Sequence, residues 1–135
     1  MLVSTPSHIN ALPDARERQL AVRRARYQTG LWAEVVAALF LTFKGYRILA
    51  RRYKTSSGEI DLVAVRGNTV AFIEVKARAS LEFAQASISR RQSQRIHRAA
   101  CEWIGKSPRF QTYEQRCDAV YILPAAWPVH VAGGV

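Results

Sequence analysis

The architecture expected of this chain follows from two neighbouring segments, GEIDLV at residues 58–63 and AFIEVKAR at residues 71–78. Both alternate apolar with polar or charged residues, which is typical of β-strands whose side chains point by turns to opposite faces of a sheet. Only the turn at Arg66-Gly67-Asn68 separates them, and so short a connection favours antiparallel pairing. We therefore predict a hairpin of two strands, Glu59–Val65 and Thr69–Ala77.

Further helices and strands are expected on either side of this hairpin. Leu31–Phe43 carries apolar side chains at the three- and four-residue spacing of a helix, and Tyr46–Tyr53 reads as a first strand. Ser89–Gly105 predicts a second core helix and Arg116–Leu123 a fourth strand. That helix is long enough for a parallel crossover. The order α-β-β-β-α-β predicts an α/β fold in which helices flank a small mixed β-sheet.

Three other stretches lie outside this core order. Pro13–Tyr27 is compatible with a separate arginine-rich helix, because Thr29-Gly30 interrupts the apolar pattern. Leu81–Ser87 is ambiguous and is interpreted as a connecting loop. Residues 1–12 show no periodicity, so we expect a flexible N-terminal arm followed by a single domain over residues 13–135.

Composition narrows the class of protein. The chain has 135 residues, of which 49% are hydrophobic, enough to bury a core and too many for a disordered tail. Lys and Arg number 20 against 10 Asp and Glu, a formal net charge of +10. So basic a domain favours nucleic acid as partner over a membrane surface. With neither a signal-peptide pattern nor an apolar run of about 20 residues, we expect a cytoplasmic protein without a membrane span.

A carboxylate from each strand of the hairpin and one lysine are expected to converge. Glu74 and Lys76 share one face of their strand, and Asp61 lies on the neighbouring strand, where cross-strand neighbours are about 5 Å apart. Two carboxylates suit Mg²⁺ or Mn²⁺, and a nearby lysine can position a water or neutralise a phosphorane-like charge. The alternative is that Glu74 and Lys76 are solvent-facing residues of a half-exposed strand.

Glu34 and Gln92 are further candidates, each with an ordinary structural alternative. Glu34 is the only charged residue between Leu31 and Phe43, and is either a third carboxylate of the site or an acid favoured by the helix dipole. Gln92 lies four residues before Ile96 on the buried side of the later helix. It either reaches the site or is a boundary glutamine.

Basic side chains outside this cluster predict a track for a phosphate backbone. The residues assigned to it are Arg51, Arg52, Lys54, Arg78, Arg91, Arg95 and Arg98. The alternative is a merely solvated charged face. A further hypothesis is that the helix with Arg16 to Arg26 binds an acidic protein partner.

The two strand motifs resemble those of the YraN-like bacterial proteins, an uncharacterised group placed in the PD-(D/E)XK, or restriction-endonuclease-like, superfamily. The resemblance runs from about Gly30 to Leu123 and implies a restriction-endonuclease-like core. It implies metal ligation by Asp61, Glu74 and Glu34, with Lys76 as the catalytic lysine and Gln92 as a polar residue of the same catalytic set. Many relatives carry Lys where this chain has Gln92.

Within that superfamily the layout is similar to that of Holliday-junction resolvases, which implies branched or single-stranded DNA as substrate. Junction cutters commonly need two active sites, which a homodimer would supply, but the sequence leaves the oligomeric state open. The leading hypothesis is thus a Mg²⁺- or Mn²⁺-dependent endonuclease. The alternative is a catalytically idle, basic nucleic-acid-binding module.

Overall fold

The computed structural model describes residues 12–135. The arm expected over residues 1–12 therefore lies outside the described residues except for Leu12, which is exposed. From the N-terminus the elements are α1 (Ala15–Phe43), β1 (Arg47–Thr55), β2 (Gly58–Arg66), β3 (Thr69–Ala77), α2 (Leu81–Ala86), α3 (Arg90–Gly105), the short 3-10 turn η1 (Pro108–Phe110), β4 (Glu114–Ile122) and β5 (Val129–Val131).

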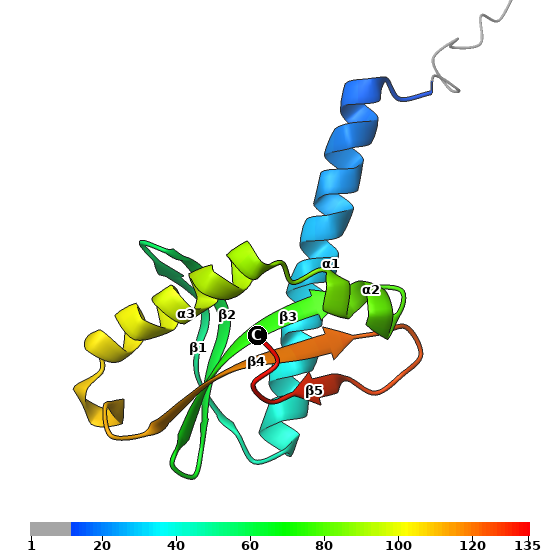
Figure 1. Cartoon of the computed structure of the whole chain (residues 1–135). Coiled ribbons are helices and arrows are strands. Elements are labelled where there is room, and N and C mark those ends of the chain that lie inside the picture. The colour runs from blue at the N-terminus through cyan, green and yellow to red at the C-terminus, as the bar shows by residue number, and fades with distance from the viewer. Residues whose placement is uncertain (1–11) are drawn as a thin grey trace, which may run out of the picture.

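The strands form one mixed sheet in the order β1-β2-β3-β4-β5 (Figure 1). The first three make an antiparallel meander, β4 runs parallel to β3, and β5 returns antiparallel to β4. The parallel step requires a long connection, which α2, α3 and η1 supply. The predicted α/β fold, with core order α-β-β-β-α-β around a mixed sheet, is confirmed.

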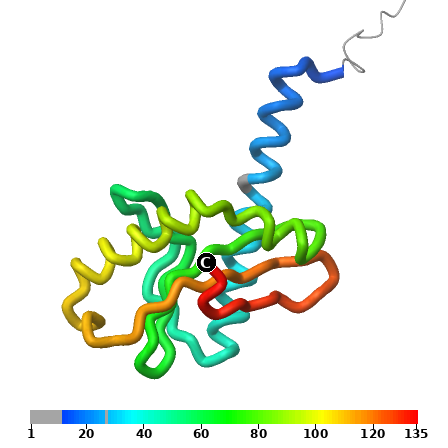
Figure 2. Tube along the Cα trace, in the orientation of Figure 1, coloured from blue at the N-terminus to red at the C-terminus, as the bar shows by residue number. Residues whose placement is uncertain are grey.

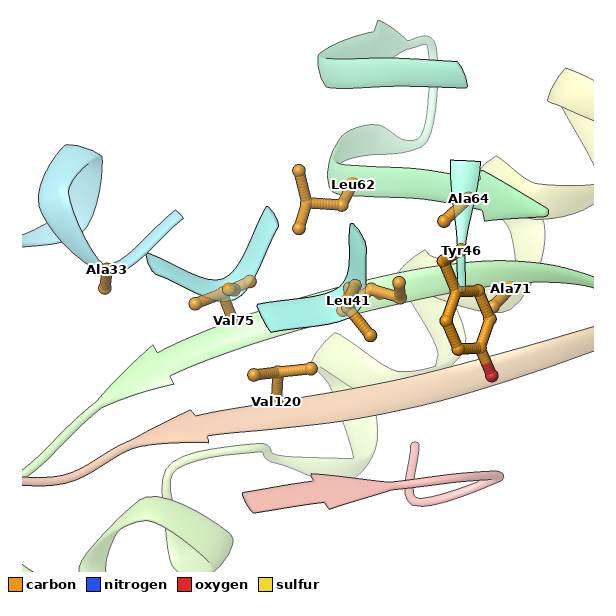
Figure 3. Close-up of a cluster of buried hydrophobic side chains, with 10 residues drawn as sticks. Ala33, Leu41, Tyr46, Leu62, Ala64, Ala71, Val75 and Val120 are labelled. Atoms are coloured by element: carbon orange, nitrogen blue, oxygen red, sulfur yellow. The ribbon is translucent and has the colours of Figure 1, made fainter. Parts of the chain in front are cut away.

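Each face of the sheet is covered by one long helix, and the short helix α2 also packs on β4. Ala33, Ala37 and Leu41 of α1 pack on Leu62, Ile73 and Val120 on one face. Figure 3 shows Leu41 among side chains from three neighbouring strands. The amphipathic helix α3 covers the other face, where Ile96 and Trp103 meet Phe72 of β3. Alternation along β3 therefore directs Ile73 and Val75 toward α1 and Phe72 and Glu74 toward α3.

The expected helix break at Thr29-Gly30 is wrong, because α1 is one continuous helix of 29 residues. Asp14 and Glu17 form a capping box at its N-terminus, and the Thr29 hydroxyl donates to the Ala25 carbonyl one turn earlier. A glycine inside a helix costs only about 1 kcal/mol, so it lowers stability without ending the helix. The N-terminal half of α1 stands clear of the sheet (Figure 2).

The loop expected at Leu81–Ser87 is also wrong, since Leu81–Ala86 is the short helix α2. The Ser80 side chain caps it by accepting the backbone N–H of Phe83. Ala84 anchors α2 in a small cluster with Tyr121 of β4. One and a half turns are too short to show a helical apolar period, which is why the pattern left the segment undefined.

None of the helices within residues 12–135 combines the length and the hydropathy that a membrane span requires.

Candidate active site

Asp61 lies at the point where β2 and β3 separate. Backbone pairing between the two strands extends from Arg66 opposite Thr69 to Leu62 opposite Ile73. One residue further on, Asp61 Oδ2 accepts a hydrogen bond of 2.8 Å from the backbone N–H of Val75. The carboxylate thus takes the role of a backbone acceptor, and this contact fixes its position between the diverging strands.

Glu74 is buried and is held from two sides. Its Oε1 accepts a hydrogen bond of 2.7 Å from Nε2 of Gln92 on α3 and lies 2.9 Å from Nζ of Lys76. Glu74 and Lys76 are two residues apart on β3, so they share the face that α3 covers. The structure therefore brings Gln92, Glu74 and Lys76 into direct contact beside Asp61.

Glu34 reaches the same place from α1, and Glu59 reaches it from the start of β2. One oxygen from each of Glu34, Glu59 and Asp61 lies within 4.8 Å of the others. Glu59 is the site residue that the sequence analysis did not assign. Its signal was present in the pattern, because Glu59 is two residues before Asp61 and so shares its side of the strand.

Arg52 of β1 lies between two of these carboxylates. Its Nε is 3.4 Å from Glu34 Oε2 and 3.4 Å from Glu59 Oε1. Arg52 adopts a φ of +52°, a left-handed conformation that costs a non-glycine residue about 1 kcal/mol or more. Its neighbours Arg51 and Tyr53 pair regularly with Leu62 and Ile60. The backbone is thus distorted where it delivers a positive charge to the acids.

The acidic group fits a hard divalent cation. Its donors are carboxylate oxygens, which Mg²⁺ and Mn²⁺ prefer. Glu34 Oε2 is buried and accepts no hydrogen bond from the residues that the structure describes, and its ion pair with Arg52 is long, at 3.4 Å, so a divalent ion could share this oxygen with Arg52. Glu34, Glu59 and Asp61 can hold such an ion, and Glu74 lies next to Asp61.

The raised pKa values of two acids in the site also favour a bound cation. Burial, followed by the neighbouring charge of Glu74, raises the pKa of Asp61 to about 8. Burial also raises the pKa of Glu34, although the nearby Arg52 lowers it in part. The protein therefore concentrates more negative charge here than its own cations compensate, and a divalent ion would relieve this repulsion.

A cavity of about 170 Å³ opens beside the carboxylates. It is lined by Gly58, Glu59, Asp61, Glu74, Gln92, Arg95 and Ile96. Organic ligands usually occupy pockets of about 300–1,000 Å³, whereas a water takes about 30 Å³. The space therefore suits a hydrated ion and one phosphate group, with Arg95 on the wall where an anion would lie.

The predicted basic track is divided by the fold. Arg52 lies inside the acidic site, Arg95 lines the cavity, and Arg78 follows the end of β3. The remaining members are exposed on β1 and α3: Arg51, Lys54, Arg91 and Arg98.

A second buried acid, Asp118 of β4, lies outside this site. Arg116 binds both of its oxygens, at 2.7 and 2.8 Å, and His130 Nε2 lies 2.8 Å from Oδ2. The backbone N–H of Gly133 donates to Oδ1 at 2.9 Å. Burial by itself would raise the pKa of Asp118, but the hydrogen bonds from His130, Arg116 and Gly133 outweigh it and lower the pKa to about 2.

Comparison with known proteins adds relatives of similar length. A family model described as "Uncharacterised protein family UPF0102" matches residues 33–122, a range that includes all of the residues placed in the acidic site. A UPF0102 protein of Rhodopseudomonas palustris (strain BisB5) is 52% identical over 109 residues, covering 81% of this chain and 83% of the relative. A UPF0102 protein of Bradyrhizobium diazoefficiens is 51% identical over 109 residues, covering 81% and 82%. A UPF0102 protein of Parvibaculum lavamentivorans is 46% identical over 118 residues, covering 87% and 89%.

Proposed function

The chain belongs to the uncharacterised protein family UPF0102, and from the geometry of its acidic site we propose that it is a metal-dependent nuclease acting on DNA. Membership confirms the expected YraN-like resemblance. Placement in the restriction-endonuclease-like superfamily and the use of Mg²⁺ or Mn²⁺ are parts of the proposal.

One observation carries the proposal: three carboxylates within 4.8 Å of one another adjoin a buried Glu74–Lys76 pair and a cavity of phosphate size. Glu34, Glu59 and Asp61 come from α1 and β2, and the pair comes from β3. Glu34 and Glu74 are buried, Asp61 is half-buried and Glu59 is exposed. Buried carboxylates are costly to maintain, which favours a role in chemistry over a role in stability. The net charge of +10 suits a polyanionic substrate.

Each residue has a definite part in this proposal. A divalent ion held by Glu34, Glu59 and Asp61 would polarise the scissile phosphate and make a bound water more acidic. Lys76 Nζ, kept in place by Glu74, would neutralise charge on the phosphate oxygens or orient the attacking water. Gln92 holds the Glu74 carboxylate from the α3 side, and the Val75 N–H fixes Asp61.

A second candidate is the binding module without turnover. The observation that favours it is Arg52, whose guanidinium lies 3.4 Å from both Glu34 and Glu59 and so supplies these acids with a cation from the chain itself. In this reading the acids and Arg52 form a structural ion cluster, and the basic surface binds nucleic acid by charge alone.

The deciding experiment is a cleavage assay on single-stranded, duplex, flapped and four-way-junction DNA with Mg²⁺, Mn²⁺ or EDTA. Wild type is compared with Glu74→Ala and with Glu114→Ala, a matched change at an exposed glutamate of β4. We expect metal-dependent cutting by wild type and Glu114→Ala that Glu74→Ala abolishes. Salt-sensitive binding without cutting by any variant would favour the binding module, and equal cutting by all three would reject Glu74 as an active-site residue.

A further inference from the structure

The face of α1 that packs on the sheet continues into solvent beyond it. Ala33, Ala37 and Leu41 are buried against the strands. N-terminal to Leu31, every described residue whose exposure is defined is exposed, and Figure 1 shows this half of the helix standing free of the body. A short helical segment without tertiary contacts is only marginally stable in water. A ligand bound along this half of α1 would therefore stabilise it.

A groove runs between this half of α1 and the end of β3, with a volume of about 810 Å³. One wall is formed by Val22, Ala25, Arg26, Thr29, Gly30 and Ala33, and the other by Val75, Lys76, Ala77 and Arg78. Three of these ten residues are basic and none is acidic. The groove is thus positively charged, and its volume accommodates several monomers of a linear polymer.

The groove and the acidic site meet at Lys76. Lys76 lines the groove, while its Nζ lies 2.9 Å from Glu74 Oε1, and Glu74 lines the small cavity. The groove and the small cavity share no lining residue, so a strand in the groove would reach the proposed reacting centre by passing the end of β3 at Lys76. A polymer whose successive phosphates occupy both spaces satisfies this arrangement, whereas a single small anion fills only one.

The floor of the groove consists of small residues. A side chain built at Gly30, on the α1 side of the groove, would meet nothing within 4 Å. The space next to the helix backbone is therefore open at this position. Farther out, Arg18, Arg23 and Arg26 of α1 lie near one another, together with Ala15, Gln19 and Val22. Basic residues therefore continue along the helix away from the acidic site.

We propose that this groove binds the phosphodiester backbone of a nucleic acid strand, with Arg26 and Arg78 as its phosphate contacts. Binding in the groove is independent of turnover, while the direction of the strand toward Lys76 rests on the proposed function. Contacts to phosphates confer affinity without base specificity, and they make that affinity depend on salt.

Binding is measured by fluorescence anisotropy on labelled single-stranded and duplex oligonucleotides in EDTA, which prevents metal-dependent cutting. Arg26→Ala and Arg78→Ala are compared with Arg47→Ala, an exposed arginine at the opposite end of the sheet. We expect each groove variant to weaken binding several-fold and to reduce the slope of log K against log salt by about 0.7 on single strands or 0.9 on duplex. Arg47→Ala should change neither.

The outcomes separate this inference from the proposed function. Groove variants that match Arg47→Ala in affinity and salt slope would overturn the groove, even if wild type cuts DNA. Wild type that never cuts but loses affinity in Arg26→Ala and Arg78→Ala would keep the groove and reject the nuclease. Nucleic acid binding unaffected by these variants, together with Arg26-dependent binding of polyglutamate, would assign the groove to an acidic protein instead.

A different observation carries a second inference, on the outer face of α1. Trp32, Leu39 and Phe43 of α1 and Trp127 of the β4–β5 loop are 70%, 66%, 90% and 84% exposed. Leu39, Phe43 and Trp127 also line a hollow of about 300 Å³, together with Val36, Phe40 and Pro128. Contiguous apolar surface of this kind marks an interaction site on a folded protein.

We infer that this face binds the same face of a second copy of the chain. The four exposed side chains present on the order of 600 Å², close to the roughly 800 Å² per partner of a standard interface. Between Leu31 and Phe43 the sole charge in the sequence is Glu34, which is buried in the acidic site. Lys44 borders the face, with its Nζ 5.5 Å from the centre of the Phe40 ring, so the apolar contact would have to outweigh the repulsion between two copies. A two-fold axis would pair α1 with α1.

Sedimentation velocity over a range of concentrations tests this inference. The mass derived for wild type should be about twice the 15.2 kDa of the chain. The double variant Phe43→Glu, Trp127→Glu should be monomeric. Phe83→Glu, which changes a comparably exposed aromatic on α2, should remain dimeric. A monomeric wild type at the highest soluble concentration would overturn the inference, and if phosphatidylcholine vesicles then capture wild type but not Trp127→Glu, the face belongs to a membrane surface.

Discussion

Two carboxylates in one sheet, the half-buried Asp61 of β2 and the buried Asp118 of β4, have opposite electrostatic environments. Asp118 is held by Arg116, His130 and a backbone N–H, and its pKa is lowered to about 2. Asp61 accepts one backbone N–H and lies beside other acids, and its pKa is raised to about 8. Compensated charge stabilises a fold, whereas uncompensated charge is a place for a cation or a reaction.

The difference comes from the neighbours that each strand acquires. Asp118 is packed beside Arg116 of its own strand and His130 of β5, both brought within 3 Å. Asp61 is instead surrounded by Glu34, Glu59 and Glu74. Of the cations closest to that group, Arg52 is shared between Glu34 and Glu59, and Lys76 pairs with Glu74.

The largest expected effect is on the reaction. Lys76→Ala should lower the rate of metal-dependent DNA cleavage by about 10²–10⁴-fold, because the group that neutralises or orients the reacting atoms is removed. Binding of Mn²⁺, followed by calorimetry, should persist because the carboxylates remain. Lys106→Ala, at an exposed lysine after α3, is the control, and a Lys76→Ala rate equal to it would contradict the role of Lys76.

Removing Asp118, the acid whose charge is compensated by its neighbours, should mainly lower the stability of the fold. Asp118→Ala leaves Arg116 and His130 without their buried partner, and removal of one member of such a pair typically costs about 3–5 kcal/mol. Urea unfolding followed by circular dichroism measures this loss. Glu114→Gln on the same strand, at an exposed position, should change stability by less than about 0.5 kcal/mol. A loss for Asp118→Ala no larger than this would show that the cluster contributes little.

Acid should remove the contribution of Asp118 selectively. Its pKa is lowered from 3.8 to about 2 in the folded protein, so its stabilisation is complete above pH 4 and is lost as the pH falls through 2. The stability difference between wild type and Asp118→Ala should shrink by about 2 kcal/mol over this window. A difference that stays constant from pH 4 to pH 2 would contradict the lowered pKa.

Asp61 should show the opposite pH dependence. The pKa of Asp61 is raised from 3.8 to about 8, so the stability it contributes is present below pH 4 and is lost as the pH rises toward 8. Asn cannot ionise and can still accept the Val75 N–H. Asp61→Asn in EDTA should therefore gain stability relative to wild type as the pH rises from 4 to 8, by up to about 5 kcal/mol, because each pKa unit corresponds to about 1.4 kcal/mol.

Thermal unfolding at the two pH values checks this gain, with Asp14→Asn at the exposed helix cap as a control without that pH dependence. A loss of stability in Asp61→Asn at pH 8 would contradict the repulsion described at the site. Stabilisation accompanied by loss of cleavage would be the trade-off expected of a functional residue.

Most of the site was predictable because its parts are close in sequence. Asp61, Glu74 and Lys76 lie on one predicted hairpin, and the alternation of a strand assigns Glu74 and Lys76 to one face. Glu34 and Gln92 were left with two readings each, because a helical pattern says which face is buried but not what that face meets. Glu59 was missed although it shares the spacing of Asp61, since its partner Glu34 lies on a different element.

Local pattern by itself determined strands β1 to β4, the two core helices and their order, because periods of two and 3.6 residues are properties of the backbone. It did not predict β5 (Val129–Val131), which is only three residues long. Only the tertiary structure decided which charges meet. In the folded protein α1 continues without a break at Thr29-Gly30. Arg52 lies between Glu34 and Glu59, and Asp118 of β4 contacts His130 of β5. The electrostatic energy of a charge depends on distance and burial, and these are set by packing between elements that are distant along the chain.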